Sequence, residues 1–381
     1  MQFFFPDSQD QVDPSFDFLT EERSLHRVRQ RDDRYAHEVL IPAPYDGLLI
    51  SKPIVDGLPG AAGKYTAAQR NRLYREGARR FFRLDHSPEP LSIMGDCGAF
   101  TYVRDNEPAF TVEEVLDFYE GCGLDIGVAV DHVVFGYDAP LDGASDAEVP
   151  TEWRHRQELT LTLAADFLRM HRSRKCKFEP MGVAHGWSPK SYASATRDLQ
   201  KIGYRRIALG GLVPLRTPDI INVLRAVSGK LRRNSQLHLL GISRTEHVTT
   251  FSGFGVTSLD STSPFRQAFK DDRDNYYGVE RNYVAIRVPQ VDGNTRLRSQ
   301  VTAGLVDQRI ARRLEAACLK LVRAYDQGRA SVEQALETLA AYSTLLGESK
   351  DRTAEYRDTL EARPWKDCTC TVCKELSLIH I

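Results

Sequence analysis

The sequence has no long hydrophobic run, no excess of charge of either sign and no basic, apolar leader at its start. Its longest apolar runs are far shorter than the ~20 residues of a membrane-spanning helix, which argues against a membrane protein. The 51 Lys and Arg residues nearly balance the 52 Asp and Glu residues, so overall charge does not indicate a nucleic-acid-binding protein. The first seven residues do not have the composition of a signal peptide, and we predict a cytoplasmic protein.

Cysteine is also scarce, with seven residues in 381. Four of the seven are scattered, and we expect them to be reduced in a cytoplasmic chain. No G-x-G-x-x-G follows the first predicted strand, which disfavours a dinucleotide-binding fold. Local clusters of basic residues occur near 79–83, 172–177, 230–233 and 309–313. Each cluster is typical of a solvated helix face, and together they are also compatible with a surface that follows phosphates.

What the sequence does contain is a regular alternation of short apolar segments and amphipathic ones. We predict strands at 47–51, 91–94, 125–130, 177–183, 206–209, 237–242 and 255–259, and an eighth at 283–288. Helices are expected between most of these strands. Two of the helices begin with capping boxes, at Thr66 and Thr111. Strands that alternate with helices pair in parallel through right-handed crossovers. Eight such units over roughly 250 residues favour an α/β fold of the closed (β/α)₈ TIM-barrel type.

The alternation divides the chain into three expected parts. Residues 1–45 are polar and are predicted to form an irregular N-terminal layer. Residues 46–300 would form the barrel. Residues 301–381 would form a helical, zinc-binding extension with helices at 302–327 and 331–346. The last six residues are unlike the expected continuation, so we expect a truncated or aberrant end.

Acids, a histidine and glycines follow the predicted strands, at the end of the barrel where active sites of this fold lie. They are Asp96, Asp131, His185, Gly210, Gly211 and Asp260, joined by Leu240 after the sixth strand. Each has an ordinary alternative: an aspartate can cap a helix, a histidine can be a buried core residue and a glycine pair can form a tight turn. Their coincidence at one end of one barrel predicts a shared pocket that contains paired acids.

Five segments, in order, resemble motifs of the tRNA-guanine transglycosylase superfamily. Residues 96–100 (D-C-G-A-F) resemble its D-S-G-G-[FY] motif, residues 182–186 (G-V-A-H-G) its G-x-x-Q-G motif and residues 208–212 (A-L-G-G-L) its A-I-G-G-L stretch. Asp260 falls where the family has its nucleophilic aspartate, and the cysteines of 368–373 are similar to its zinc cluster. Cys97, Ala99 and residues 261–264 (S-T-S-P, in place of L-P-T-R) look like the bacterial and phage branch that acts on DNA.

The resemblance implies an enzyme that replaces guanine in DNA with a 7-deazaguanine such as 7-cyano-7-deazaguanine (preQ0). Asp260 would be the nucleophile that forms a covalent glycosyl-aspartate, and Asp96 the general acid/base. The other predicted site residues would bind the base: Asp131 at its N1–H and 2-amino group, His185, Gly210 and Gly211 at O6 and the 7-substituent, and Phe100 and Leu240 on its two faces. Phe100 and Leu240 could instead be core residues.

The same resemblance implies a structural zinc ion, because three thiolates within six residues are typical zinc ligands. The expected ligands are Cys368, Cys370 and Cys373. The fourth ligand stays open, since the only later histidine, His380, lies in the unusual last segment.

Three other functions remain open from the sequence. The same chemistry could act on tRNA, or the barrel could bind nucleic acid without catalysis as a subunit of a larger modification system. The paired acids Asp96 and Asp260 argue against the second of these, since a binding module has no need of them. A generic glycosidase barrel is the third. DNA, the 7-deazaguanine base and other proteins of a DNA-modification system are the expected partners.

Overall fold

The computed structural model describes residues 1–7, 11–17, 22–145, 147–270, 273–278, 280–291 and 293–369. They belong to two compact units, one made of Met1–Val12 and Asp33–Pro264 and the other of Asp13–Asp32 and Phe265–Ile381. Each unit has a hydrophobic core of its own. In the described ranges, no helix is both long and apolar enough to cross a membrane.

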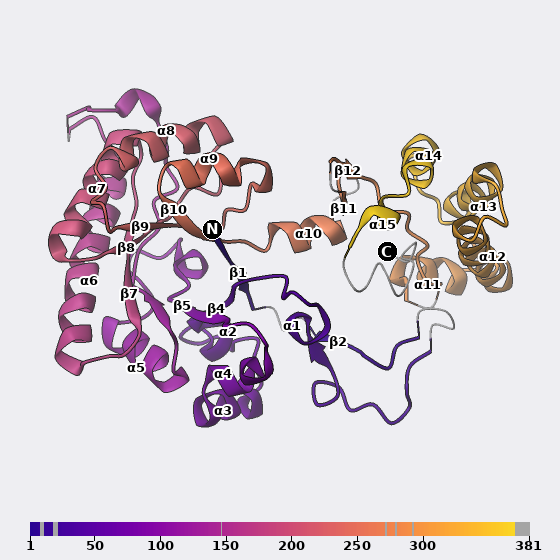
Figure 1. The fold of residues 1–381 in the computed structure, drawn as a ribbon, viewed down its shortest axis with the longest axis horizontal. Coiled ribbons are helices and arrows are strands. Elements are labelled where there is room, and N and C mark those ends of the chain that lie inside the picture. Colours follow the sequence, from indigo (N-terminus) through magenta and orange to yellow (C-terminus); the bar gives the residue numbers. More distant parts are fainter. Residues whose placement is uncertain are drawn as a thin grey trace. The chain divides into compact units, whose positions relative to one another are not determined.

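Eight parallel strands of the first unit form a closed barrel (Figure 1). Around the barrel the order is β1 (Gln2–Pro6), β10 (Val256–Asp260), β9 (Gln236–Leu239), β8 (Arg206–Leu209), β7 (Glu179–Ala184), β6 (Ile126–Val128), β5 (Ser92–Asp96) and β4 (Gly47–Ser51), and β4 pairs again with β1. The predicted (β/α)₈ barrel is therefore confirmed. All seven strands predicted between residues 47 and 259 overlap observed strands, and two of them, 47–51 and 206–209, agree at both ends.

The predicted position of the eighth strand is wrong. The N-terminal residues Gln2–Pro6 form β1 and pair with both β10 and β4, so this part of the chain belongs to the barrel and not to an irregular layer. In 283–288 only Tyr283 is in a strand, β12 (Asn282–Tyr283), which pairs antiparallel with β11 (Tyr276–Tyr277) in the second unit. Both segments are apolar, and an apolar run predicts burial without specifying the partner strand.

Helices follow most of the barrel strands (Figure 1). They are α2 (Lys52–Asp56), α3 (Ala67–Glu76), α4 (Ala78–Phe81), α5 (Val112–Cys122), α6 (Thr151–Arg174), α7 (Pro189–Ile202), α8 (Thr217–Ser228), α9 (Val248–Gly253) and α10 (Ser263–Lys270). Shorter elements are α1 (Ala36–Val39), the pair β2 (Gln11–Val12) and β3 (Arg34–Tyr35), and the 3₁₀ turns η1 (Leu84–His86), η2 (Ala99–Tyr102), η3 (Ala139–Leu141) and η4 (Thr245–His247). Both predicted capping boxes are present, with Thr66 accepting from the Gln69 N–H and Thr111 from the Glu114 N–H.

The second unit is mainly helical. Its helices are α11 (Thr295–Thr302), α12 (Gln308–Asp326), α13 (Val332–Leu345), α14 (Thr353–Ala362) and α15 (Pro364–Asp367). A capping box formed by Ser331 and Gln334 opens α13, where the helix of 331–346 was predicted. Among the predicted zinc ligands, Cys368 lies directly after α15, whereas Cys370 and Cys373 lie outside the described residues, as does His380. Within the described residues, no cluster of three or more His, Cys, Asp or Glu side chains is arranged to hold a metal ion.

Side chains alternate between the two faces of the barrel wall, as a strand requires. A cluster that includes Phe4, Met94, Met181 and Val183 fills the interior. A larger cluster packs the outer faces of the strands against the helices. The interior is therefore a packed core, and a cavity is available only at an end of the barrel.

Candidate active site

A cavity of about 210 Å³ lies at the carboxyl ends of the barrel strands. All eight catalytic and base-binding residues predicted from the sequence line it: Asp96, Phe100, Asp131, His185, Gly210, Gly211, Leu240 and Asp260. They come from six different strands or the loops that follow them, so the barrel closure is what brings them together. Their individual roles stay predictions.

Asp260 is the last residue of β10 and is only 6% exposed. One of its carboxylate oxygens, Oδ1, accepts hydrogen bonds from the backbone N–H of Gly241 at 2.9 Å and from Nε2 of His238 at 3.1 Å. In the described part of the chain no donor reaches the other oxygen, Oδ2. Two donors on one oxygen fix the orientation of the carboxylate.

His238 is a site residue that the sequence analysis missed. It lies on β9, it is fully buried, and its Nδ1 is 2.9 Å from the hydroxyl of Ser258 on β10. A signal was available, because residues two apart on a strand share one face. His238 precedes the pocket residue Leu240 by two positions, and Ser258 precedes Asp260 by two. Polar residues at such positions in apolar strands point into the barrel below the pocket.

Asp96 is the last residue of β5, and its Oδ2 accepts a hydrogen bond from the hydroxyl of Ser51 at 3.0 Å. Burial raises the pKa of the Asp96 carboxyl to about 7, and the nearby negative charges of Asp131 and, more weakly, Asp260 add to this rise. A carboxyl group with a pKa near neutrality can both give and take a proton under ordinary conditions.

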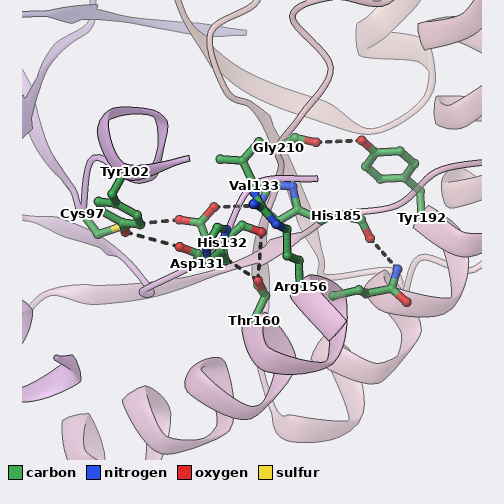
Figure 2. A network of polar contacts seen from close by, with 11 residues as sticks. Cys97, Tyr102, Asp131, His132, Val133, Arg156, Thr160, His185, Tyr192 and Gly210 are labelled. Carbon is green, nitrogen blue, oxygen red and sulfur yellow. Dashed lines mark hydrogen bonds and ion pairs between the residues drawn. The ribbon is translucent and has the colours of Figure 1, made fainter. Parts of the chain in front are cut away.

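Asp131 follows β6 and is held on both sides by side chains (Figure 2). The thiol of Cys97 donates to Oδ1 at 3.1 Å, and Nε2 of His185 lies 2.7 Å from Oδ2. Burial, together with the charge of Asp131, raises the pKa of Cys97 well above its usual value, so the sulfur keeps its proton and acts as a donor. The result is a buried, oriented carboxylate that can accept further hydrogen bonds from a ligand.

The glycine pair after β8 leaves room for His185 and for the backbone beside it. A side chain at Gly210 would place its Cβ 2.3 Å from Cε1 of His185, and one at Gly211, where φ is +75°, would lie 2.3 Å from the Val134 carbonyl oxygen. The hydroxyl of Tyr192 donates to the Gly210 carbonyl at 2.8 Å (Figure 2). Glycine is therefore required at both positions because neighbouring atoms leave no room for a Cβ atom, and not merely because the chain turns there.

Phe100 and Leu240 both line the pocket, but in different settings. Phe100 lies on η2 and is 68% exposed, with its ring packed edge-on against Phe135 at 5.7 Å between centroids. Leu240 is half-buried and packs against the interior cluster. The alternative of a core residue therefore does not hold for Phe100, which offers an aromatic surface at the rim of the pocket.

Comparison with known proteins identifies a relative over nearly the full length. Over 382 aligned residues, covering 99% of the chain and 90% of the relative, the sequence is 48% identical to a DNA-guanine transglycosylase of Salmonella montevideo. The chain belongs to the DNA-guanine transglycosylase family. Proteins named tRNA-guanine(15) transglycosylase are more distant, at 26% identity in Pyrobaculum aerophilum and 28% in Thermococcus onnurineus. Each aligns with 48% of the chain and with 35% and 29%, respectively, of its own length.

No protein-family model matches the chain. Membership of the DNA-guanine transglycosylase family therefore rests on the full-length relative, with the tRNA enzymes as distant support for the wider superfamily. The pocket is chemically suited to a transglycosylase, since it holds one carboxylate stabilised by two donors and a second carboxyl group with a pKa near 7. A carboxylate and a separate proton donor are the two groups that glycosyl transfer through a carboxylate nucleophile requires.

Proposed function

We propose that the protein exchanges guanine in DNA for a 7-deazaguanine base through a covalent glycosyl-aspartate. The observation that carries this proposal is the pair of unlike acids, Asp260 and Asp96, in one pocket that also holds the Asp131–His185 pair. The target guanine would leave the base stack to enter the pocket, as bases do in other enzymes that act on duplex DNA.

In the first half of the reaction, the Asp260 carboxylate attacks C1′ of the deoxyribose. An O–C1′ bond forms while the C1′–N9 bond breaks, and the electron pair of that bond moves to the departing guanine. Asp96 protonates the guanine as it leaves, which its raised pKa permits at neutral pH. The sugar then remains attached to Asp260 as an ester.

In the second half, the 7-deazaguanine takes the place of guanine, and its N9 attacks C1′. The ester bond breaks and its electron pair returns to the Asp260 carboxylate, while Asp96 accepts the N9 proton. Two displacements at C1′ restore the original configuration, as in retaining glycosidases.

Base recognition would use the fixed acceptor and the surfaces around it. The N1–H and 2-amino groups of guanine are donors, and the Asp131 carboxylate is held in place to accept them. His185, Gly210 and Gly211 would lie near O6 and the 7-substituent. Phe100 and Leu240 would cover the two faces of the base.

Cys97 offers a test of the way Asp131 is held. Cys97→Ser keeps a donor for Oδ1 of Asp131 and is expected to retain kcat/KM for the base within about 3-fold, whereas Cys97→Ala removes the donor and is expected to lower it about 10-fold. The two variants are compared in the exchange assay described below. Equal activity of Cys97→Ala and Cys97→Ser would show that the thiol merely fills space.

The proposed polymer is DNA and the proposed incoming base carries a 7-nitrile, with other proteins of a DNA-modification system as further partners in the cytoplasm. The test is incorporation of labelled guanine or 7-cyano-7-deazaguanine into duplex DNA and into unmodified tRNA, side by side, with Asp260→Ala as the control. Incorporation of label into DNA by the wild type but not by Asp260→Ala would support both DNA as the substrate and Asp260 as the nucleophile. Label only in tRNA would overturn the choice of DNA, and label in neither would favour a barrel that binds without catalysis.

A structural zinc ion belongs to the same proposal. The donor set of Cys368, Cys370 and Cys373 suits zinc, which prefers thiolates, and it leaves one position for a fourth ligand. Bound there, zinc would cross-link the end of the chain and supply no chemistry to the pocket. Cys368 follows α15 directly, and the neighbouring Trp365 is part of the core of the second unit.

Purified protein is expected to contain about one zinc ion per chain, as a single structural site would. Cys370→Ser should lower the zinc content and the melting temperature, because it removes a ligand and metal binding contributes to folding. Elemental analysis and thermal unfolding with and without a chelator measure both effects. Cys176→Ser, which alters a cysteine of the barrel unit, is the control and should keep its metal. A zinc-free protein whose melting is insensitive to chelators would contradict the assignment.

A further inference from the structure

We propose that His238 and Ser258 position the nucleophile, holding Oδ1 of Asp260 so that Oδ2 is the oxygen that attacks the sugar. This inference rests on the proposed function and assigns a role to two residues that do not line the pocket. It concerns how one aspartate among several in the pocket is oriented toward the sugar.

The three residues form a chain of hydrogen bonds across two adjacent strands. Nε2 of His238 is 3.1 Å from Oδ1 of Asp260, and Nδ1 of the same ring is 2.9 Å from the hydroxyl of Ser258. His238 and Ser258 are both 0% exposed. The ring of Phe4, from β1 on the other side of β10, packs edge-on against the imidazole at 6.1 Å. The imidazole is thus held at both nitrogens and by packing.

The hydrogen positions follow from the partners. An ionised Asp260 can only accept, so Nε2 of His238 must carry a hydrogen to bond with Oδ1. In a neutral imidazole the other nitrogen then has a lone pair, and the Ser258 hydroxyl donates to it. Ser258 therefore selects the tautomer of His238 that can donate to Asp260, which is the role that a second hydrogen-bond partner has for other functional histidines.

This arrangement makes the two carboxylate oxygens of Asp260 unequal. Oδ1 carries two hydrogen bonds, from His238 and from the Gly241 N–H, whereas in the described residues no protein donor reaches Oδ2. Oδ2 is accordingly the oxygen that forms the bond to C1′, while the electron pair of the C1′–N9 bond goes to N9. Oδ1 becomes the carbonyl oxygen of the ester.

The same two donors act again when the ester breaks. As N9 of the incoming base attacks C1′, the C1′–Oδ2 bond breaks and its electron pair returns to the carboxylate, where the charge is shared with Oδ1. Donors that are already in place stabilise that developing charge without reorganisation. His238 therefore contributes more to the transition states than to binding of the base, and its loss should affect kcat more than KM.

The hydrogen bonds also distinguish Asp260 from the other acid of the reaction. The titratable groups around Asp260 are Asp96, Asp131 and His185 in the pocket and the buried His238. Burial and the neighbouring carboxylates raise the pKa of Asp96 to about 7. Asp260 instead has one oxygen held by two donors from β9 and the turn after it.

The experiment compares kcat and KM of His238→Ala, His238→Gln and Ser258→Ala with those of the wild type in the exchange assay. Glutamine can place an amide N–H near the position of Nε2, so it tests rescue of the donor. His37→Ala is the matched control, because His37 is also buried and hydrogen-bonded, to Tyr45, but does not line the pocket. Thermal unfolding of every variant shows which ones fold.

We expect kcat of His238→Ala to fall about 10- to 100-fold, with KM for the base changed by less than about 3-fold. The lost donor acts mainly on the transition states, so the effect on kcat should exceed the effect on KM. His238→Gln should recover most of the rate, and Ser258→Ala should lie between the wild type and His238→Ala. His37→Ala should leave kcat unchanged.

A loss of rate in folded His238→Ala that glutamine does not rescue would indicate a purely structural role, and that result would overturn the inference. Wild-type kcat in folded Ser258→Ala would also overturn it, even if His238→Ala failed to fold. If the wild type exchanges no base into any nucleic acid, the proposed function itself fails, and this inference fails with it.

Discussion

Replacement of Asp260 by asparagine is expected to reduce base exchange by about 10⁴-fold or more, because a neutral amide cannot replace the carboxylate nucleophile. The amide has nearly the same shape, so the barrel should stay folded. Single-turnover incorporation of labelled base measures the loss. Denaturing electrophoresis of the reaction should reveal a protein–DNA adduct for the wild type and none for Asp260→Asn.

A carboxylate outside the pocket provides the control. Asp142 lies next to η3 and accepts a hydrogen bond from the backbone N–H of Lys190, and it does not line the cavity. Asp142→Asn should exchange base at close to the wild-type rate. If Asp260→Asn kept more than about a tenth of the activity, Asp260 could not be the covalent nucleophile.

Replacement of Asp96 by asparagine is expected to slow exchange by about 10²- to 10⁴-fold while stabilising the fold at neutral and alkaline pH. The loss of rate reflects the loss of the proton donor and acceptor. The gain in stability follows from the raised pKa of about 7, since a buried carboxyl group that must ionise near two other acids destabilises the folded state.

The direction of the pH effect can be derived from that pKa. The folded-state pKa of Asp96 is above the ordinary value of 3.8, so the carboxyl group binds its proton more tightly in the folded protein. Proton binding by Asp96 therefore stabilises the folded state. This stabilisation is complete below about pH 4 and is lost as the pH rises to about 7. Above that pH, Asp96→Asn should exceed the wild type by roughly 2–4 kcal/mol.

Thermal or denaturant unfolding of both proteins between pH 4 and pH 9 measures this effect. The two stability curves should meet near pH 4 and separate by several degrees in Tm above pH 7. Activity of the wild type should fall over the same upper range, as Asp96 loses the proton that the departing guanine needs. Stability curves that stay parallel throughout would contradict a raised pKa for Asp96.

The pocket residues could be predicted from the sequence because of a property of the fold. In a parallel barrel the carboxyl ends of all strands meet at one end, so residues such as Asp96 and Asp260 converge although they are far apart in the chain. Locating each strand end to within a few residues was sufficient. The spacing of local motifs also predicted the helix starts at Thr66, Thr111 and Ser331, where the caps depend only on residues three positions apart.

Other features depend on pairing between distant segments, which a local pattern does not encode. Residues 2–6 and 283–288 are similar apolar runs, yet only the first closes the barrel, because pairing with both β10 and β4 is decided by tertiary structure. The same holds for the partners of the acids. Cys97 and His185 meet at Asp131, and His238 reaches Asp260, only after the strands are in register.

By itself, the sequence determined the fold class and eight of the residues that line the pocket, because hydrophobic periodicity and strand ends are local properties. Only the tertiary structure decided the chemical state of those residues. Burial and neighbouring charge raise the pKa of Asp96, while His238 and Gly241, from β9 and the turn after it, donate to one oxygen of Asp260. Two aspartates of identical chemistry thereby become suited to different steps, since electrostatic environment depends on contacts that only the folded chain creates.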